Sequence, residues 1–344
     1  MTILLSTVPA SFADDAPGVS AASAIVMHSG GEVIYEKNAD ERSLIASTTK
    51  IMTAIVAMEN LELDKVIEIK PEFCGIEGST MYLAPGQRYT VRELLLGLLL
   101  ESGNDAAVAL AVSAGGSEAR FVRMMNRKAM QLGMYGTSFA NPHGLDDAKH
   151  YSTARDLAYL MDYCMRNDDF AKLVGTKSCN VGKFTFCNHN RLLMICQGCI
   201  GGKTGFTEAA GRCLVSVCER NQTRYICVTL SDPNDWDDHI NLYNWAFSEY
   251  SLRNVLDGVE FDVPVLSGTK KVVKASAPDG LYLFVPNSEE LVLTAELPRF
   301  AFAPLEQGDT AGRISVSMNG RVLAMCELVF TESIPAAASV SMLL

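Results

Sequence analysis

The chain has 344 residues, enough for one large domain or two ordinary ones, and 48% of them are hydrophobic and 20% charged. Its formal net charge of −11 and its lack of a basic cluster argue against nucleic acid as a partner. No apolar run approaches the roughly 18 residues that a transmembrane helix requires, so we expect no membrane span.

The N-terminal end resembles the rear part of a secretory signal. It holds the apolar run Ile3-Leu4-Leu5 and the small-x-small sequence Ser11-Phe12-Ala13, which is typical of a signal cleavage site. The basic start of a signal is missing, so a frayed apolar terminus is the alternative. We expect residues 1–13 to be a signal remnant and the protein to be exported to a bacterial cell envelope.

The first predicted elements are a hairpin and a helix. Residues 22–27 and 32–36 have the composition of two strands, and Ser29-Gly30-Gly31 supplies the turn between them. A helix destined for the core follows at Ser47-Thr48-Thr49-Lys50, because apolar residues recur at helical spacing from Ile51 to Met58.

Ser47 and Lys50 are three positions apart and share one helix face, so the hydroxyl and the amine can meet. A serine hydroxyl is a poor nucleophile until a base takes its proton, and a lysine kept neutral by burial can do so. The positive end of the helix dipole would favour negative charge on the serine oxygen. Most isolated Ser-x-x-Lys sequences are only a capping serine and a solvated lysine, so this pair needs support from other motifs.

The middle of the chain is predicted to be helical. One helix begins at the cap Thr90, with Glu93 as its capping-box partner, and runs to about Leu100. Ser102-Gly103-Asn104 lies in the turn that follows it. The other helices expected here cover residues 106–112 and 117–132, and a later one is capped by Ser152 or Thr153.

From Gly201 onward the pattern favours strands, and Lys203-Thr204-Gly205 lies on the first of them. Asn319-Gly320, between two strand-like runs, is the best hairpin signal in the chain. The other elements predicted in this half are strands at 212–219, 223–230, 313–318 and 321–330 and an aromatic-rich helix at 235–255.

Ten cysteines are unusual for an exported chain, and they show no small-scaffold spacing. Cys213, Cys218 and Cys227 fall in strand-like runs, where they would act as small core hydrophobes. Cys196 and Cys199 form a Cys-x-x-Cys sequence, which suggests a metal or redox pair. No second ligand pair stands at zinc spacing, so we favour free thiols or a local disulfide and expect no metal and no cofactor.

Three short motifs occur in the order Ser47-x-x-Lys50, Ser102-x-Asn104 and Lys203-Thr204-Gly205. This trio is typical of penicillin-binding proteins and class A β-lactamases. With Asn141-Pro142-His143-Gly144-Leu145 and the run from His150 to Leu157, it makes the chain similar to serine-type D-alanyl-D-alanine carboxypeptidases, the low-molecular-weight penicillin-binding proteins.

The resemblance implies an α/β (α+β) fold, with an antiparallel sheet flanked by helices plus an all-helical subdomain. It assigns residues 20–257 to a penicillin-binding, D-Ala-D-Ala carboxypeptidase domain and residues 260–332 to a small β-rich C-terminal domain. The substrates it implies are peptidoglycan stem peptides ending in D-Ala-D-Ala, and the inhibitors are β-lactam antibiotics. The protein would act on the outer side of the cytoplasmic membrane or be secreted.

The resemblance also assigns the catalytic roles. Ser47 would attack the carbonyl between two D-alanines and form an acyl-enzyme, while Lys50 takes its proton. Ser102 would relay the proton to the leaving amine. Asn104 would hold Lys50 and the substrate amide.

The substrate-binding residues implied by the resemblance lie on the third motif. Lys203 and Thr204, on an edge strand, would meet the substrate carboxylate and backbone, and Gly205 would leave room for that approach. The backbone N–H of Phe206 would form the oxyanion hole with that of the nucleophile, and Thr207 completes the set.

Two positions depart from the family pattern. Relatives often carry proline two residues before the nucleophile, where this chain has Ile45, and some carry an arginine near the start of the last helix, which residues 235–239 lack. The group that recognises the terminal carboxylate therefore stays open, with Arg212 as a substitute. His143 and His150 are expected to fix loops rather than act as bases.

A β-lactamase and a catalytically silent envelope-binding protein are the competing functions. A class A β-lactamase needs a Glu-x-x-x-Asn base between the second and third motifs, and residues 133–200 contain no glutamate. Relatives commonly end in an amphipathic membrane-surface helix, but residues 333–344 have no Lys or Arg and are too short for one. We expect the chain to be soluble after signal removal, since peripheral membrane association would need a C-terminal anchor not evident in it.

Overall fold

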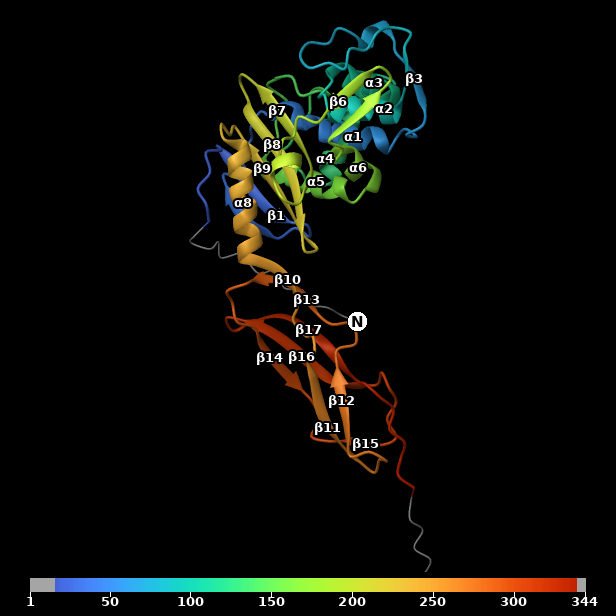
Figure 1. The fold of residues 1–344 in the computed structure, drawn as a ribbon, viewed down its shortest axis with the longest axis vertical. Helices are drawn as coiled ribbons and strands as arrows, with labels where there is room; N and C mark the ends of the chain where they lie inside the picture. Colours follow the sequence, from blue (N-terminus) through green and yellow to red (C-terminus); the bar gives the residue numbers. More distant parts are fainter. Residues whose placement is uncertain (1–15, 339–344) are drawn as a thin grey trace, which may run out of the picture. The chain divides into compact units, whose positions relative to one another are not determined.

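The computed structural model describes residues 16–338, so the predicted signal remnant and the last six residues of the C-terminal end lie outside the described residues. The described chain forms two compact units, one up to Phe247 and one from Ser248. The first holds an antiparallel sheet with helices, and the second is built from strands (Figure 1). The predicted fold class is confirmed.

A five-stranded antiparallel sheet organises the first unit, in the order β2-β1-β9-β8-β7. The expected N-terminal hairpin is confirmed, with Gly30 and Gly31 at positive φ in its turn. β7 lies at the edge and carries Lys203-Thr204-Gly205. The strands are β1 (Ser23–His28), β2 (Val33–Lys37), β7 (Cys199–Thr207), β8 (Gly211–Arg220) and β9 (Thr223–Leu230).

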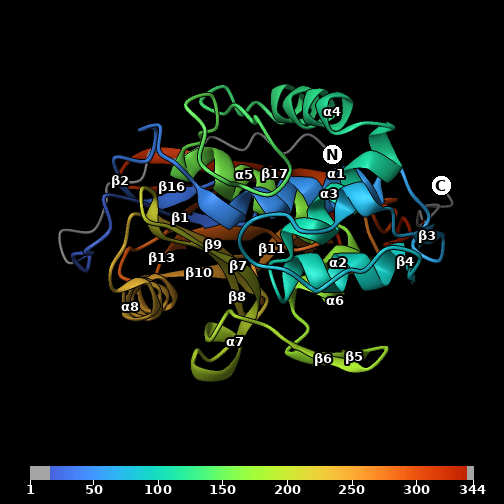
Figure 2. The same cartoon turned by 90° about the horizontal axis from the view of Figure 1, so that it is seen from above.

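Helices cover both faces of this sheet (Figure 2). α5 (Ala154–Met165) packs on β1 and β9, and α8 (Asp235–Glu249) lies on the opposite face. His239 of α8 joins it to the sheet, because its ring nitrogens lie 2.7 Å from the Ser216 hydroxyl and 3.0 Å from the Thr229 hydroxyl. Burial lowers the pKa of His239 to about 3, so this link is made by a neutral imidazole.

The helix predicted over residues 235–255 is wrong at its C-terminal end. Tyr250–Asn254 forms strand β10, which pairs with β13 (Tyr282–Pro286) in the second unit. The ring of Tyr250 stacks on that of Phe284, with centroids 5.6 Å apart. Pairing with a strand about 30 residues away outweighs the local aromatic pattern in this segment. The sequence alone does not reveal that pairing.

The remaining helices of the first unit form a group in which α1 contacts α2, α3 and α4. The predicted capping box is confirmed, since the Thr90 and Glu93 side chains each accept the other's backbone N–H. Ser117 caps α4, and Thr153, not Ser152, caps α5. The group comprises η1 (Ala46–Thr49), α1 (Lys50–Met58), α2 (Val91–Leu99), α3 (Asn104–Gly115), α4 (Glu118–Gln131) and α6 (Asp168–Val174). Short elements connect them: β3 (Val66–Glu68), η2 (Pro71–Phe73), β4 (Arg88–Thr90), β5 (Ser178–Val181), β6 (Phe184–Cys187) and α7 (Leu192–Ile195).

The second unit contains a six-stranded sheet in the order β14-β16-β17-β12-β11-β15 and has its own apolar core. The hairpin predicted at Asn319-Gly320 is confirmed, and both residues have the positive φ that a tight hairpin turn requires. Its strands are β11 (Glu260–Leu266), β12 (Val272–Ser276), β14 (Val292–Glu296), β15 (Ala301–Phe302), β16 (Thr310–Met318) and β17 (Arg321–Phe330). Across residues 16–338, no helix combines the length and the apolar character needed to cross a bilayer.

Candidate active site

Ser47 lies in the short 3₁₀ turn η1, which leads directly into α1. The preceding residue, Ala46, has a φ of 45°, a strained conformation for a residue with a side chain. A Cβ on Gly144 would stand 2.0 Å from the Ala46 carbonyl oxygen, so only glycine fits at that position. Close packing of the loop that contains Gly144 against η1 therefore holds the strained turn in which Ser47 lies.

The Lys50 amine contacts three oxygen atoms: Nζ lies 2.8 Å from Ser47 Oγ, 2.7 Å from Asn104 Oδ1 and 2.7 Å from the His143 carbonyl oxygen. The amide and carbonyl oxygens can only accept hydrogen bonds, whereas the serine hydroxyl can also donate. A neutral amine has two protons for the two acceptors and one lone pair for the serine proton. The geometry therefore fits a lysine that acts as the base for Ser47.

Burial favours the neutral form of Lys50. The side chain is fully buried, and this loss of water lowers the pKa of Lys50 well below its usual 10.5. The nearby Lys203 lowers that pKa further, whereas Asp105 acts in the opposite direction.

Ser102 and Asn104 are placed by the turn between α2 and α3. Ser102 is buried and has a φ of 60°, another uncommon conformation for a residue with a side chain. Asn104 begins α3, and its Nδ2 donates to the Glu77 carbonyl oxygen at 2.5 Å. That bond fixes the amide so that its oxygen faces Lys50.

Lys203 comes from the edge strand β7 and meets the same turn. Its Nζ lies 3.1 Å from Ser102 Oγ and 2.8 Å from the Thr204 carbonyl oxygen. The side chain is 1% exposed, and burial lowers the pKa of Lys203 to about 7. Two hydrogen-bonded groups result, one linking Ser47, Lys50 and Asn104 and the other linking Ser102 and Lys203.

β7 passes directly beside the nucleophile turn. A Cβ on Gly205 would come within 3.0 Å of both the Ile45 carbonyl oxygen and the Ser47 nitrogen. Glycine therefore allows the strand backbone to approach η1 this closely. Thr204 is half-buried, and Phe206 has 66% of its surface exposed.

Thr207 lies at the end of β7 and connects the strand to a loop. Its hydroxyl donates to Asp146 Oδ1 at 2.9 Å and accepts from the Ala210 N–H at 3.0 Å. Both bonds occupy the hydroxyl with protein partners, and the predicted contact of Thr207 with substrate stays a prediction.

The two histidines near the site hold loops in place. Because His150 Nδ1 accepts from the Ala140 N–H at 3.1 Å, the proton lies on Nε2, which is 2.7 Å from Thr49 Oγ1. His143 Nδ1 accepts from the Leu145 N–H at 3.3 Å. Burial lowers the pKa of each histidine to about 4. These neutral, internally bonded rings agree with the loop-fixing role expected for them.

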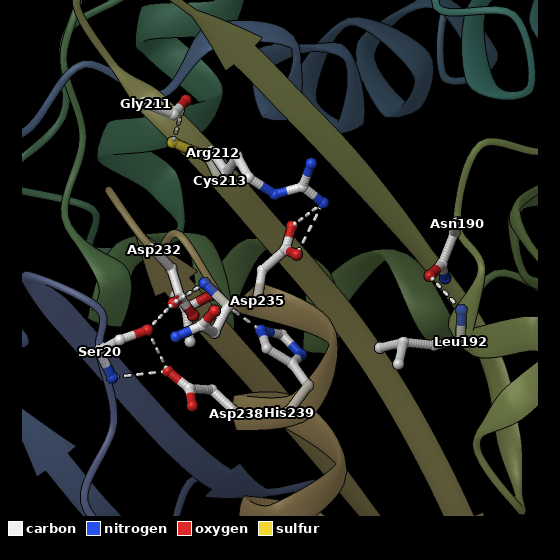
Figure 3. Close-up of polar contacts among 12 residues, drawn as sticks. Ser20, Asn190, Leu192, Gly211, Arg212, Cys213, Asp232, Asp235, Asp238 and His239 are labelled. Atoms are coloured by element: carbon white, nitrogen blue, oxygen red, sulfur yellow. Dashed lines mark hydrogen bonds and ion pairs between the residues drawn. The ribbon is translucent and has the colours of Figure 1, made fainter.

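Arg212 is paired within the protein (Figure 3). Its Nη2 donates to both carboxylate oxygens of Asp235, at 2.7 and 2.9 Å, and its guanidinium lies 5.3 Å from the centre of the Trp236 ring. The pairing with Asp235 uses Nη2 alone, so recognition of a substrate carboxylate by Arg212 stays a prediction.

Two supporting groups were missed by sequence reasoning: the His143 carbonyl oxygen that accepts from Lys50, and the Asp105 carboxylate. Asp105 accepts the backbone N–H groups of Met81 and Leu83, both at 3.0 Å, and so holds that segment beside the start of α3. A backbone carbonyl has no residue signature, and the position of Asp105 directly after Asn104 was the one available signal.

All ten cysteines are free thiols, so of the two alternatives for Cys196 and Cys199 the structure has free thiols. Over residues 16–338, no group of three or more His, Cys, Asp or Glu side chains is placed to hold a metal ion.

Comparisons with known proteins agree over most of the chain. The family model for D-alanyl-D-alanine carboxypeptidase matches residues 10–234, and that for the penicillin-binding protein 5 C-terminal domain matches residues 257–336. D-alanyl-D-alanine carboxypeptidase DacF of Bacillus subtilis (strain 168) is 31% identical over 331 residues, covering 91% of this chain and 85% of the relative. DacC of Escherichia coli (strain K12), a protein of the same description, is 31% identical over 344 residues, covering 93% and 86%. The structure of penicillin binding protein 5 from Haemophilus influenzae matches with a TM-score of 0.72 at 28% identity, covering 93% of this chain and 98% of that one.

Proposed function

The chain belongs to the D-alanyl-D-alanine carboxypeptidase family and is a serine-type carboxypeptidase, and we propose that Ser47 is the nucleophile of its reaction. The observation that carries this proposal is the 2.8 Å contact between the Ser47 hydroxyl and the buried amine of Lys50. The two acceptors opposite, on Asn104 and His143, leave the amine lone pair for the serine proton.

In the first step the Ser47 oxygen bonds to the carbonyl carbon of the penultimate D-alanine while its proton moves to the Lys50 nitrogen. The C–N bond to the last D-alanine then breaks, and the proton held on Lys50 passes to the leaving nitrogen by way of the Ser102 hydroxyl, while the Lys203 amine, 3.1 Å from that hydroxyl, keeps its own proton. An ester remains on Ser47. Water attacks that ester by the reverse proton path, which releases the shortened peptide and restores the serine hydroxyl.

The substrate backbone would lie along the free edge of β7. Lys203, in its protonated form, would face the terminal carboxylate, and Thr204 would contact the peptide beside it. The backbone N–H groups of Ser47 and Phe206 would receive the developing oxyanion. Asn104 would contact the substrate amide, with Thr207 at the far end of the strand.

The natural substrates would be peptidoglycan stem peptides ending in D-Ala-D-Ala, and β-lactams would acylate the same serine. Such peptides lie outside the cytoplasmic membrane, and the signal-like residues 1–13 support export to that side. Expression from the native start in a bacterium, followed by N-terminal sequencing of the mature protein, tests this part. We expect cleavage after Ala13, whereas an intact cytoplasmic chain would contradict export.

Mass spectrometry of the intact protein over time after addition of benzylpenicillin tests the reaction. We expect a long-lived adduct of one penicilloyl group, because residues 133–200 hold no glutamate to activate a water against it, together with release of D-alanine from a peptide ending in D-Ala-D-Ala. Ser47→Ala should lose both signals, whereas Ser43→Ala, a nearby serine outside the proposed site, should keep both.

Three results would oppose this proposal. An adduct that persists in Ser47→Ala would move the nucleophile elsewhere. Rapid hydrolysis of benzylpenicillin with no surviving adduct would favour a β-lactamase. Absence of both the adduct and D-alanine release in the native protein would favour a catalytically silent binding protein.

A further inference from the structure

Three cysteines that the proposed reaction does not use lie close together at one end of the five-stranded sheet of the first unit. Cys196 follows α7, Cys199 begins β7, and Cys218 lies on β8 directly opposite Cys199 in the strand register. The sulfur atoms of Cys196 and Cys218 are 3.5 Å apart, close to contact and without a bond between them. Cys196 of the Cys-x-x-Cys sequence is therefore in contact with a sulfur atom on β8.

The two sulfur atoms have unequal environments. The hydrogen bond from Cys218 and the positive charge of Arg220 lower the pKa of Cys196 to about 7. Hydrogen bonds to its cysteine neighbours and burial raise the pKa of Cys218, so that thiol keeps its proton. Arg220 is itself held in place, because its Nε donates to the Gln197 carbonyl oxygen at 2.9 Å. A thiolate beside a protonated thiol is suited to attack by the first sulfur and resolution by the second.

We propose that Cys196 and Cys218 form a redox site at which a peroxide converts the two thiols into a disulfide. The Cys196 sulfur attacks one peroxide oxygen, the O–O bond breaks, and the other oxygen leaves as water after taking a proton. The Cys218 sulfur then attacks the sulfenic acid on Cys196, and the S–S bond forms as the hydroxyl leaves with the Cys218 proton as water. The thiols lose two electrons and two protons in total, and one hydrogen peroxide becomes two waters.

Cys199 is less suited to be the second partner. Its sulfur hydrogen-bonds to the Gly201 carbonyl oxygen at 3.6 Å and to the Asn190 amide at 4.0 Å, in addition to a hydrogen bond with Cys218. A Cys196–Cys218 bond would tie the turn before β7 to β8, at the start of the strand that carries Lys203. This redox site does not depend on the proposed carboxypeptidase reaction.

Peptide mapping of the oxidised full chain tests the proposal. The reduced protein, freed of reductant, is treated with a small excess of hydrogen peroxide, alkylated with N-ethylmaleimide and digested without reduction. We expect one cross-linked peptide pair containing Cys196 and Cys218, which disappears in Cys196→Ser. In Cys218→Ser the reaction should stop at the sulfenic acid of Cys196, which dimedone captures. Cys187→Ser, which removes an exposed cysteine, should leave the cross-link unchanged.

Several outcomes would overturn the proposal. A cross-link between Cys196 and Cys199, modification of Cys187 with both proposed partners still alkylated, or no oxidation at all would each do so. Should circular dichroism show that Cys218→Ser is unfolded, Cys218→Ala takes its place, and the cross-link map of the native chain decides by itself whether the pair forms.

Discussion

The first unit buries two lysines at the candidate active site, one on a helix and one on a strand. Lys50 begins helix α1 and its amine meets three oxygens, whereas Lys203 lies within strand β7 and its amine meets two. Burial lowers both pKa values, that of Lys50 well below 10.5 and that of Lys203 to about 7. Lys203 adds to the shift of Lys50, because two positive charges so close disfavour each other.

The charge of Lys203 lowers the pKa of Lys50 beyond what burial does, and the helix end acts in the same direction. The N-terminal end of a helix carries partial positive charge, so it disfavours an ammonium group on Lys50 and favours negative charge on Ser47. A strand has little net dipole, and Lys203 is shifted by burial alone. Similar burial can therefore prepare one lysine to accept a proton and leave another able to carry charge near neutral pH.

Removal of the proposed base, Lys50, should slow the reaction most. Lys50→Ala should slow acylation of Ser47 by benzylpenicillin by about 10²- to 10⁴-fold, the range that a positioned general base contributes. Stopped-flow or quench measurement of the acylation rate, with circular dichroism as the check on folding, gives the result. Lys128→Ala, which removes a lysine paired with Glu59 away from the site, should acylate at the native rate. Near-normal acylation in Lys50→Ala would show that Lys50 is not the base that takes the Ser47 proton.

A smaller effect is expected at the second lysine, and it should depend on the substrate carboxylate. A hydrogen bond to a charged group contributes about 1.5–3 kcal/mol, so Lys203→Ala should lower kcat/KM for a D-Ala-D-Ala peptide by roughly 10- to 100-fold. The loss should be much smaller for the same peptide with a C-terminal amide. Arg212→Ala is the comparison variant, because Arg212 is the alternative partner for the carboxylate and its Nη2 is paired with Asp235. If Lys203→Ala lost equal kcat/KM on both peptides, or if Arg212→Ala lost more, the substrate carboxylate would not bind to Lys203.

The close approach of β7 to the nucleophile turn offers a third test. A Cβ at position 205 would lie 3.0 Å from the Ile45 carbonyl oxygen and from the Ser47 nitrogen, so one of the two segments must shift. Overpacking of this kind costs about 1–3 kcal/mol, and we expect Gly205→Ala to lower both the unfolding free energy and the acylation rate. Gly18→Ala, where no atom lies within 4 Å of the new methyl group, should change neither. Unchanged acylation in Gly205→Ala would show that this contact does not position Ser47.

Much of this arrangement was predictable from local sequence signals. The hairpin at Gly30-Gly31, the capping box of Thr90 and Glu93, and the turn at Asn319-Gly320 were all identified from turn and cap chemistry. The fold class followed from the resemblance of three ordered motifs, and the structure brings those motifs together. The spacing of Ser47 and Lys50 indicated their contact, because one helix turn fixes it.

The features that escaped prediction depend on contacts between distant segments. The end of the helix at Glu249 is set by pairing of β10 with β13, and the third acceptor of Lys50 is a backbone carbonyl of His143. Likewise, the Cys196 sulfur meets that of Cys218, 22 residues further along the chain on β8. Periodicity and spacing report only on neighbours in sequence, so they carry no information about such pairs.

The buried Lys203 should also make the stability of the protein depend on pH. Its pKa is about 7 in the folded protein and near 10.5 once burial is removed, so between these values the unfolded chain binds more protons than the native one. The unfolding free energy contributed by this group therefore rises with pH across that window, by at most about 1.4 kcal/mol per pH unit. Below pH 7 both states are protonated, and the burial penalty is present in full.

Lys203→Met removes this titration while keeping most of the side-chain volume. Urea unfolding of both proteins at pH 7, 8 and 9 should therefore show the native protein gaining stability relative to the variant as the pH rises. Taking the difference between the two proteins removes the contribution of all groups that they share. Lys65→Met, which replaces an exposed lysine of the same unit, should give a difference that does not change with pH. If the unfolding free energies of the native protein and Lys203→Met changed equally with pH, the pKa of Lys203 would not be lowered by burial. Lys203 would then carry a permanent positive charge on the strand, beside the neutral amine of Lys50 on the helix.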